Sequence, residues 1–160
     1  MALHSDDHIN LLRAFMARNV RFLIIGGHAA IYYGVNRNTG DLDILVEPTE
    51  ENGNNILKAL SDLALDIPDI KLEEFTKQLV LSFGFEPDAV DIINYTPGIS
   101  FEEVFKNSVK VSFSGLEIPM IDIRDLIKNK ESLNRQGEKS HLDRYDIEVL
   151  KRILKNKEEQ

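Results

Sequence analysis

An apolar run that ends in two glycines, followed by a second apolar run that opens with alternating aspartates, most constrains how this chain can fold. The first run is Phe22–Ile25, the glycines are Gly26 and Gly27, and thirteen residues separate them from Asp41. Each run has the length and content of a buried strand, and residues i and i+2 of a strand share one face of a sheet. Asp41 and Asp43 are therefore expected to point together, beside the turn that the glycines form.

This arrangement predicts a site for a metal ion and a nucleotide. Two adjacent carboxylates repel each other and raise one pKa unless a cation lies between them, and ligand sets made only of oxygen suit Mg²⁺ or Mn²⁺. A strand-to-helix turn exposes free backbone N–H groups at the helix start, where phosphate binds well. Glycine lets the phosphate approach closely. A plain tight turn is the alternative for Gly26 and Gly27.

The segment from Phe22 to Val46 resembles the core motif of the DNA polymerase beta-like nucleotidyltransferase superfamily: an apolar strand, two small residues, a spacer and then Asp-x-Asp. The spacer residues His28, Gly34, Arg37 and Thr39 look like those of its small prokaryotic stand-alone branch. That branch is related to nucleotidyltransferases of abortive-infection and toxin–antitoxin systems. The resemblance implies a minimal nucleotidyltransferase fold. It also implies an enzyme that uses Mg²⁺ (or Mn²⁺) to transfer an NMP group from a nucleoside triphosphate to a hydroxyl or protein acceptor.

This chemistry requires a third carboxylate, and Asp91 is the candidate. In-line transfer gains from two metal ions that stabilise the attacking and leaving oxygens. Asp91 follows Asp43 by 48 residues, a separation that the family commonly has, and it lies in the apolar strand pattern 89–93. A lone Asp in such a strand needs a partner. The catalytic and metal-binding residues are thus expected to be Asp41, Asp43 and Asp91. Asp88 is the competitor, but it is better placed to cap or turn the chain.

Six residues are candidates for nucleotide binding: Gly26, Gly27, His28, Arg37, Thr39 and Lys130. His28 could touch phosphate or the acceptor, or it could pack beside the turn as a helix-start residue. Arg37 could hold phosphate in a bidentate way, or pair with Asp41 or Asp43 and so hold the loop. Lys130 could reach the β- or γ-phosphate.

The C-terminal segment echoes a family pattern in which a helix Lys and an Arg precede an Asp-x-x-Asp helix. The matching residues are Lys130, Arg135, Asp143 and Asp146, but the stretch 136–139 looks inserted, which leaves the role of Arg135 open. Asp143 and Asp146 are expected to accept hydrogen bonds from Lys or Arg beside the site. A solvated helix face is the alternative for the whole group.

Periodicity and capping residues predict an α+β (α/β) fold, with a mixed sheet of about five strands packed against helices. The expected helices are 6–18 with Ser5 as N-cap, 28–33, a helix from the cap Thr49 to about 61, 101–106 capped by Ser100, a helix from the cap Asp122 to about 132, and 141–155. The expected strands are 22–25, 41–46, 89–93, 109–113 and 116–120, the last two joined by a Ser114-Gly115 turn. Residues 79–85 fit a strand or a helix end, 62–78 are ambiguous, and 135–139 are expected to form a loop.

A length of 160 residues favours one domain, with a core at about 20–120 and C-terminal helices at about 122–155. The chain has no cysteine and no run of 18 apolar residues, and its acidic N-terminus lacks a signal core, so we expect a cytoplasmic protein without membrane contact. A net charge of −8 argues against extended duplex nucleic acid as a partner. The acceptor stays open among a small molecule, a protein and an RNA end. Because the chain is short, a homodimer or a partner protein could help to bind it.

Two other functions stay open. An antibiotic nucleotidyltransferase of the aminoglycoside or lincosamide type can be of similar size, and an anionic pocket for a cationic drug would suit the net charge. A non-catalytic, antitoxin-like binding module could keep the same fold, although the presence of all three carboxylates argues against an inactive enzyme. A P-loop kinase is excluded because the chain contains no Gly-x-x-x-x-Gly-Lys-Ser/Thr motif.

Overall fold

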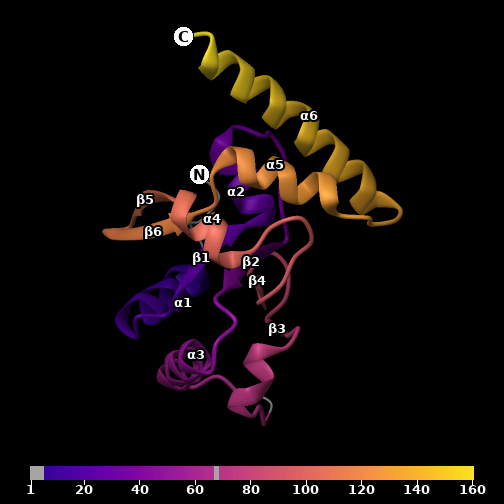
Figure 1. Cartoon of the computed structure of the whole chain (residues 1–160). Coiled ribbons are helices and arrows are strands. Elements are labelled where there is room, and N and C mark those ends of the chain that lie inside the picture. The colour runs from indigo at the N-terminus through magenta and orange to yellow at the C-terminus, as the bar shows by residue number, and fades with distance from the viewer. Residues whose placement is uncertain (1–5, 67–68) are drawn as a thin grey trace.

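The computed structural model describes residues 6–66 and 69–160 and has helices on both sides of a mixed β-sheet (Figure 1). The helices are α1 (Asp6–Ala17), α2 (Gly26–Tyr33), α3 (Glu50–Asp62), the 3-10 helix η1 (Leu72–Thr76), α4 (Phe101–Asn107), α5 (Ile123–Ser132) and α6 (Glu138–Glu158). The strands are β1 (Phe22–Ile25), β2 (Asp41–Val46), β3 (Val80–Phe83), β4 (Ala89–Ile93), β5 (Val109–Phe113) and β6 (Leu116–Met120). Figure 1 shows α1 and α3 on one side of the strands and α5 and α6 on the other.

The sheet has the strand order β3-β4-β2-β1-β6-β5. Strand β1 pairs antiparallel with β2 and parallel with β6, whereas β2 pairs parallel with β4. Two antiparallel hairpins, β3–β4 and β5–β6, form the two edges of the sheet. Strands β1 and β2 are therefore central. Because helices cover both faces, all four residues of β1 can be apolar and buried.

The core lies between the central strands and the helices α1 and α3. Its fully buried side chains include Phe15 of α1, Phe22 of β1 and Ile56 of α3. On β2, Leu42 and Ile44 are fully buried, and they alternate along the strand with the aspartates. Side chains of a strand alternate between its two faces. Burial of the apolar set therefore directs the aspartates of β2 to the opposite face of the sheet.

The fold class and most of the predicted elements are confirmed. The N-cap side chains of Thr49, Ser100 and Asp122 accept hydrogen bonds from backbone N–H groups in the first turns of α3, α4 and α5. The turn between β5 and β6 has positive φ angles at Ser114 (49°) and Gly115 (81°), as a two-residue hairpin requires. The predicted Ser5 cap lies outside the described residues.

Three predictions about the elements need completion or correction. Residues 79–85, which fit either a strand or a helix end, contain the edge strand β3, so the sheet has six strands instead of about five. Helix α2 begins at Gly26, two residues before the predicted start, and the glycines form its first turn. Helix α6 begins at Glu138, although 138 and 139 were expected in a loop. Gly137 turns the chain with a φ of 67°, and an acidic residue at 138 favours a helix start.

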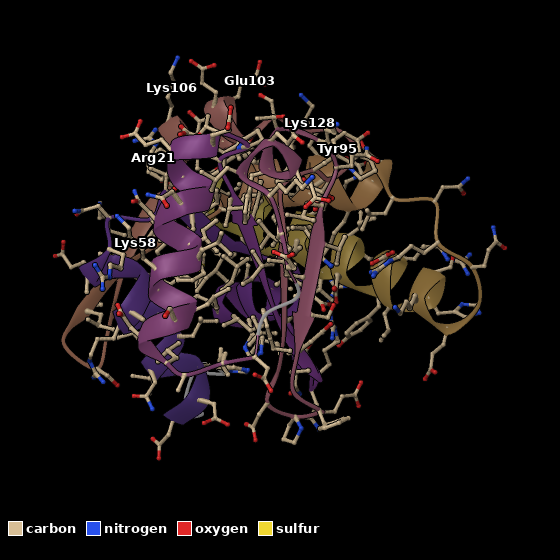
Figure 2. All side chains as sticks on the ribbon, turned by 90° about the horizontal axis from the view of Figure 1, so that it is seen from below. Arg21, Lys58, Tyr95, Glu103, Lys106 and Lys128 are labelled. Atoms are coloured by element: carbon tan, nitrogen blue, oxygen red, sulfur yellow. The ribbon has the colours of Figure 1, made fainter. Side chains whose placement is uncertain are left out.

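Basic and acidic side chains both occur on the side of the molecule that Figure 2 shows, which is the underside in Figure 1. Figure 2 labels Arg21, Lys58, Lys106 and Glu103 on this side. Arg21 forms an ion pair with Glu47 at 2.7 Å. The basic side chains here are thus interspersed with acidic ones.

Within the described ranges, no helix combines the length and the apolar character needed to cross a membrane.

Candidate active site

Three carboxylates meet where the strands β2 and β4 lie side by side. In the parallel pairing, Asp43 lies directly opposite Asp91, and Asp41 precedes Asp43 by two residues on the same strand. One carboxylate oxygen from each of the three residues lies within 4.8 Å of the other two. The end of β1 adjoins this carboxylate cluster (Asp41, Asp43 and Asp91), because Ile25 pairs with Asp43. The cluster therefore lies beside the point where β1 turns into α2.

Burial and mutual repulsion make the carboxylate cluster hold protons more tightly than free carboxylic acids do. Burial, together with the charges of Asp41 and Asp91, raises the pKa of Asp43 to about 7. Burial also raises the pKa of Asp41, as do a hydrogen bond and the charge of Asp91, while the charge of Lys139 opposes the rise. A bound cation would relieve this repulsion, and ligands made only of oxygen suit Mg²⁺ or Mn²⁺. The residues of the cluster thus fit a divalent metal ion.

A cavity of about 400 Å³ opens over the carboxylate cluster, which is within the usual range for small-molecule sites. Its walls come from the start of α2, the loop that follows α2, the strands β2 and β4, and the C-terminal helices. The lining includes the cluster itself and five of the predicted nucleotide-binding residues, namely Gly26, Gly27, Arg37, Thr39 and Lys130. The fold thus brings together residues that are spread over most of the chain.

Both glycines at the start of α2 are required by the packing of the chain itself. Gly26 has a φ of 70°, which disfavours other residues, and a methyl group on it would overlap the Asp43 carboxylate. A methyl group on Gly27 would lie 2.6 Å from Oγ1 of Thr39 and 3.1 Å from Nη2 of Arg37. These contacts support the tight-turn alternative. The same lack of side chains leaves the helix start open to the cavity, so the phosphate-binding role stays a prediction.

Two carboxylates of α6 hold three of the cations that border the cavity, Arg37, Lys130 and Arg135. Nε and Nη2 of Arg37 each donate to Asp146 at 2.8 Å, and Nζ of Lys130 lies 2.9 Å from the same carboxylate. Arg135 donates two hydrogen bonds to Asp143, which also lies 3.7 Å from Lys130. Burial works against the ionised form of Asp146, but the hydrogen bond from Arg37 and the charge of Lys130 hold its pKa below the usual value. The prediction that Asp143 and Asp146 accept hydrogen bonds beside the site is confirmed.

The partner of Arg37 differs from the one expected. The sequence suggests phosphate, or one of Asp41 and Asp43, whereas the structure pairs Arg37 with Asp146, which lies 109 residues away in the chain. Nη1 of Arg37 also donates to the backbone oxygen of Asn38 at 2.8 Å. Arg37 therefore does hold the loop before β2, but it does so through helix α6, and its contact with phosphate stays a prediction.

His28 lies in the core instead of the cavity. Its side chain is buried, and its ring contacts that of His8 edge to face, with 5.4 Å between the ring centres. Among the described residues that line the cavity, His28 does not occur. Nε2 of His8 lies 3.2 Å from the backbone oxygen of Ala89, which connects α1 to the start of β4. In the structure, His28 therefore packs beside the turn, which is the alternative that the sequence analysis left open.

The cavity lining also includes residues that the sequence analysis does not single out, among them Thr96, Asn129, Glu86 and Lys139. Asn129 donates to Oγ1 of Thr96 at 2.8 Å, and both side chains are buried. Glu86, from the loop between β3 and β4, and Lys139, at the start of α6, also line the cavity. No local pattern marks Thr96 or Asn129, because their hydrogen bond joins segments 33 residues apart.

The structure separates Asp91 from its competitor Asp88. Asp88 is exposed and lines a different cavity, of about 280 Å³, whereas Asp91 lies in the carboxylate cluster. The pairing of β4 with β2 explains the difference, since only Asp91 is in register with Asp43.

No protein-family model and no curated protein sequence matches this chain. Among solved structures, it is similar to the lincosamide antibiotic adenylyltransferase LnuA with lincomycin bound, at a TM-score of 0.56 and 15% identity, over 96% of this chain and 99% of that one. The structure of ANT(2″)-Ia in complex with adenylyl-2″-tobramycin also matches, at a TM-score of 0.48 and 16% identity, over 93% of this chain and 95% of that one. At that TM-score the second likeness adds nothing to the fold assignment.

The chain therefore has a nucleotidyltransferase fold, a single mixed sheet with a carboxylate cluster at the junction of β1, α2 and β2. This agrees with the resemblance of the segment from Phe22 to Val46 to the superfamily motif. Membership of the superfamily and of its small prokaryotic branch stays a prediction.

Proposed function

We propose that this chain is a divalent-metal-dependent nucleotidyltransferase that transfers an NMP group from a nucleoside triphosphate to a hydroxyl group. The observation that carries the proposal is the convergence of Asp41, Asp43 and Asp91, whose ligand oxygens lie within 4.8 Å of one another. The nearby helix start and the cations along the same cavity support it. The fold shared with an adenylyltransferase agrees with the proposal. It is not the main support, because one fold can host many different functions.

In the proposed reaction, the acceptor oxygen forms a bond to the α-phosphorus, the bond between the α-phosphorus and the bridging oxygen breaks, and pyrophosphate leaves. Asp41, Asp43 and Asp91 would hold Mg²⁺ or Mn²⁺, which when bound stabilises the charge on the attacking and leaving oxygens. Asp91 accepts the proton of the acceptor hydroxyl. The N-terminus of α2, at Gly26 and Gly27, binds a phosphate oxygen through backbone N–H groups.

Two cations that line the cavity bind the leaving group. Lys130 and Arg37 line the cavity, and both are fixed by Asp146 at distances of 2.8–2.9 Å. Positive charge held in place costs no reorganisation when negative charge develops on the β- and γ-phosphates. This gives the ion pairs of α6 a role in nucleotide binding as well as in folding.

The acceptor defines two versions of the function. In the first, the hydroxyl belongs to a protein side chain, in a toxin–antitoxin or phage-defence setting. In the second, it belongs to a small molecule, and the likeness to LnuA over almost the whole of both chains favours lincosamide-type acceptors as the first to test. Incubation with labelled nucleoside triphosphate and Mg²⁺, with either lincomycin or a cell extract, separates the two by the mass of the labelled product.

The central test is nucleotide binding that depends on a divalent metal. Mn²⁺ together with a non-hydrolysable nucleoside triphosphate should raise the melting temperature, because a ligand that binds only the folded state stabilises it. Asp43→Asn should abolish this effect. Asp88→Asn, an equally conservative change at an exposed carboxylate outside the cavity, should leave it unchanged. The absence of metal-dependent nucleotide binding in titration calorimetry of the unmodified chain would overturn the proposal, and the non-catalytic module would then be the better interpretation.

A further inference from the structure

The carboxylate cluster continues as a row across the sheet to its edge. Asp43 on β2 lies opposite Asp91 on β4, and Asp91 in turn lies opposite Ser82 on β3. Side chains at paired positions of neighbouring strands point to the same face of a sheet. Asp43, Asp91 and Ser82 therefore form three successive members of one row, with Ser82 at the outer end on the edge strand.

The hydroxyl of Ser82 holds the carboxylate of Asp91. Its Oγ donates to Oδ1 of Asp91 at 2.6 Å, a short distance of the kind that an ionised acceptor gives. On the other side of Asp91, its neighbour in register is Asp43 of β2, and carboxylate oxygens of Asp41 and Asp43 lie within 4.8 Å of one of its own. Asp91 thus lies between the other carboxylates of the cluster and a hydroxyl of the edge strand.

The packing of the chain does not account for this hydrogen bond. Ser82 is exposed and Asp91 is half-buried, so water could satisfy both groups if the bond were absent. A half-buried aspartate can rotate its carboxylate, whereas a metal ligand or a general base must keep one orientation. The hydrogen bond supplies that orientation from a strand that contributes no carboxylate to the cluster.

We propose that Ser82 is a positioning residue that orients Asp91 for metal binding and for proton transfer, an inference that depends on the proposed nucleotidyltransferase function. Partners of this kind, which hydrogen-bond to a ligating carboxylate, typically contribute 10- to 100-fold to metal affinity or activity. Ser82 acts through Asp91 and does not contact the nucleotide. This contribution comes from the hydroxyl group of Ser82 alone. Ser82→Ala would remove the hydroxyl but leave the strand β3 intact.

The test compares three variants by Mn²⁺ binding in the presence of a non-hydrolysable nucleoside triphosphate, followed by electron paramagnetic resonance of free Mn²⁺. Ser82→Ala should weaken Mn²⁺ binding roughly 10- to 100-fold. Ser82→Thr keeps the hydroxyl, suits an edge strand, and should bind Mn²⁺ like the unmodified chain. Ser112→Ala is the matched control, because Ser112 is an exposed serine on β5, the edge strand at the other end of the sheet. It should also bind Mn²⁺ normally.

Steady-state kinetics give the second readout once an acceptor is known. Ser82→Ala should lower kcat while the KM for the nucleoside triphosphate changes little, because the phosphate contacts on α2 and α5 are untouched. Equal Mn²⁺ affinity in Ser82→Ala and the unmodified chain would overturn the inference. Mn²⁺ binding that is as weak in Ser82→Thr as in Ser82→Ala would also overturn the inference, because the hydroxyl would then not be the group that orients Asp91.

Two further outcomes separate this inference from the proposed function. If the unmodified chain binds no Mn²⁺ with nucleotide, the proposed function fails and the role of Ser82 fails with it. The intact mass of the chain could rise by the mass of one NMP group after incubation with a hydrolysable nucleoside triphosphate. If peptide mapping then assigns this increase to Ser82, Ser82 is an acceptor. The positioning role is overturned in that case, while the transfer activity stands.

Discussion

Replacing Asp146 by alanine tests whether helix α6 holds the cations of the cavity. The Asp146 side chain is fully buried, and it accepts two hydrogen bonds from Arg37 at 2.8 Å while Nζ of Lys130 lies 2.9 Å away. The side chain of Lys130 is only 2% exposed, so it cannot turn to water when its partner is removed. The substitution therefore leaves one buried ammonium and one half-buried guanidinium without their main counter-charge.

The expected loss of stability follows from this burial. Breaking a buried ion pair by removing one partner typically costs about 3–5 kcal/mol, because the other charge remains desolvated. Asp143 lies 3.7 Å from Lys130 and relieves part of the penalty, so we expect the lower end of that range. For a chain of this length, a loss of about 3 kcal/mol lowers the melting temperature by roughly 6–12 °C.

Urea unfolding of Asp146→Ala measures the loss, and Asp62→Ala provides the matched control. Asp62 accepts two hydrogen bonds from Arg18 at 2.7 Å, so the residue type and the pairing geometry are the same, but both side chains are more than 40% exposed. Exposed pairs contribute little to stability, so Asp62→Ala should shift the urea midpoint only slightly. Similar midpoint shifts in the two variants would refute the reasoning, because burial would then not determine the cost.

Three further predictions concern the carboxylate cluster and its surroundings. Because the folded-state pKa of Asp43 is raised to about 7 from 3.8, the metal-free chain binds more protons folded than unfolded in that window. Its stability should therefore fall between about pH 4 and pH 7, by up to about 4 kcal/mol at roughly 1.4 kcal/mol per pKa unit, and then level off. Urea unfolding with a chelator present should find this slope, and Asp43→Asn should flatten it. Asp91→Asn should cut turnover by at least ~10²-fold, the usual scale for a general base, with the fold retained in circular dichroism; normal turnover in this variant together with its loss in Asp88→Asn would reverse the assignment. Gly26→Ala should lose Mn²⁺ binding in calorimetry and cost well over ~1 kcal/mol, because the residue needs positive φ and a methyl group would displace Asp43; retained Mn²⁺ affinity would show that the turn does not shape the cluster.

Much of the local structure follows from the sequence because it depends on neighbours in the chain. The apolar runs of β1 and β2 are local sequence patterns, and the caps Thr49 and Asp122 and the Ser114-Gly115 turn rest on interactions within a few residues. The weakest predictions fall where local signals conflict. The edge strand β3 carries an apolar Val80 at an exposed position, so its sequence lacks a clear apolar–polar alternation, and only its pairing with β4 identifies it as a strand.

The carboxylate cluster could be predicted in part. The period of two residues along a strand places Asp41 and Asp43 on one face whatever the rest of the chain does. Asp91 is favoured over Asp88 by its place in an apolar strand pattern and by the family spacing, but neither signal shows that it meets Asp43. The parallel register of β2 and β4 decides between them, and register is a property of the assembled sheet.

The sequence indicated that Asp143 and Asp146 pair with Lys or Arg, but the tertiary structure decided which individual side chains meet. Arg37 binds Asp146 and not the aspartates close to it in the chain, because α6 folds back over the loop before β2. His28, although it follows the glycines directly, turns into the core against His8. Ser82 reaches Asp91 only through the β3–β4 pairing. The sequence by itself thus determined which carboxylates lie on one strand and where the chain turns, because those follow from local geometry. The tertiary structure decided which charge meets which, because ion pairs and register depend on segments that are far apart until the chain folds.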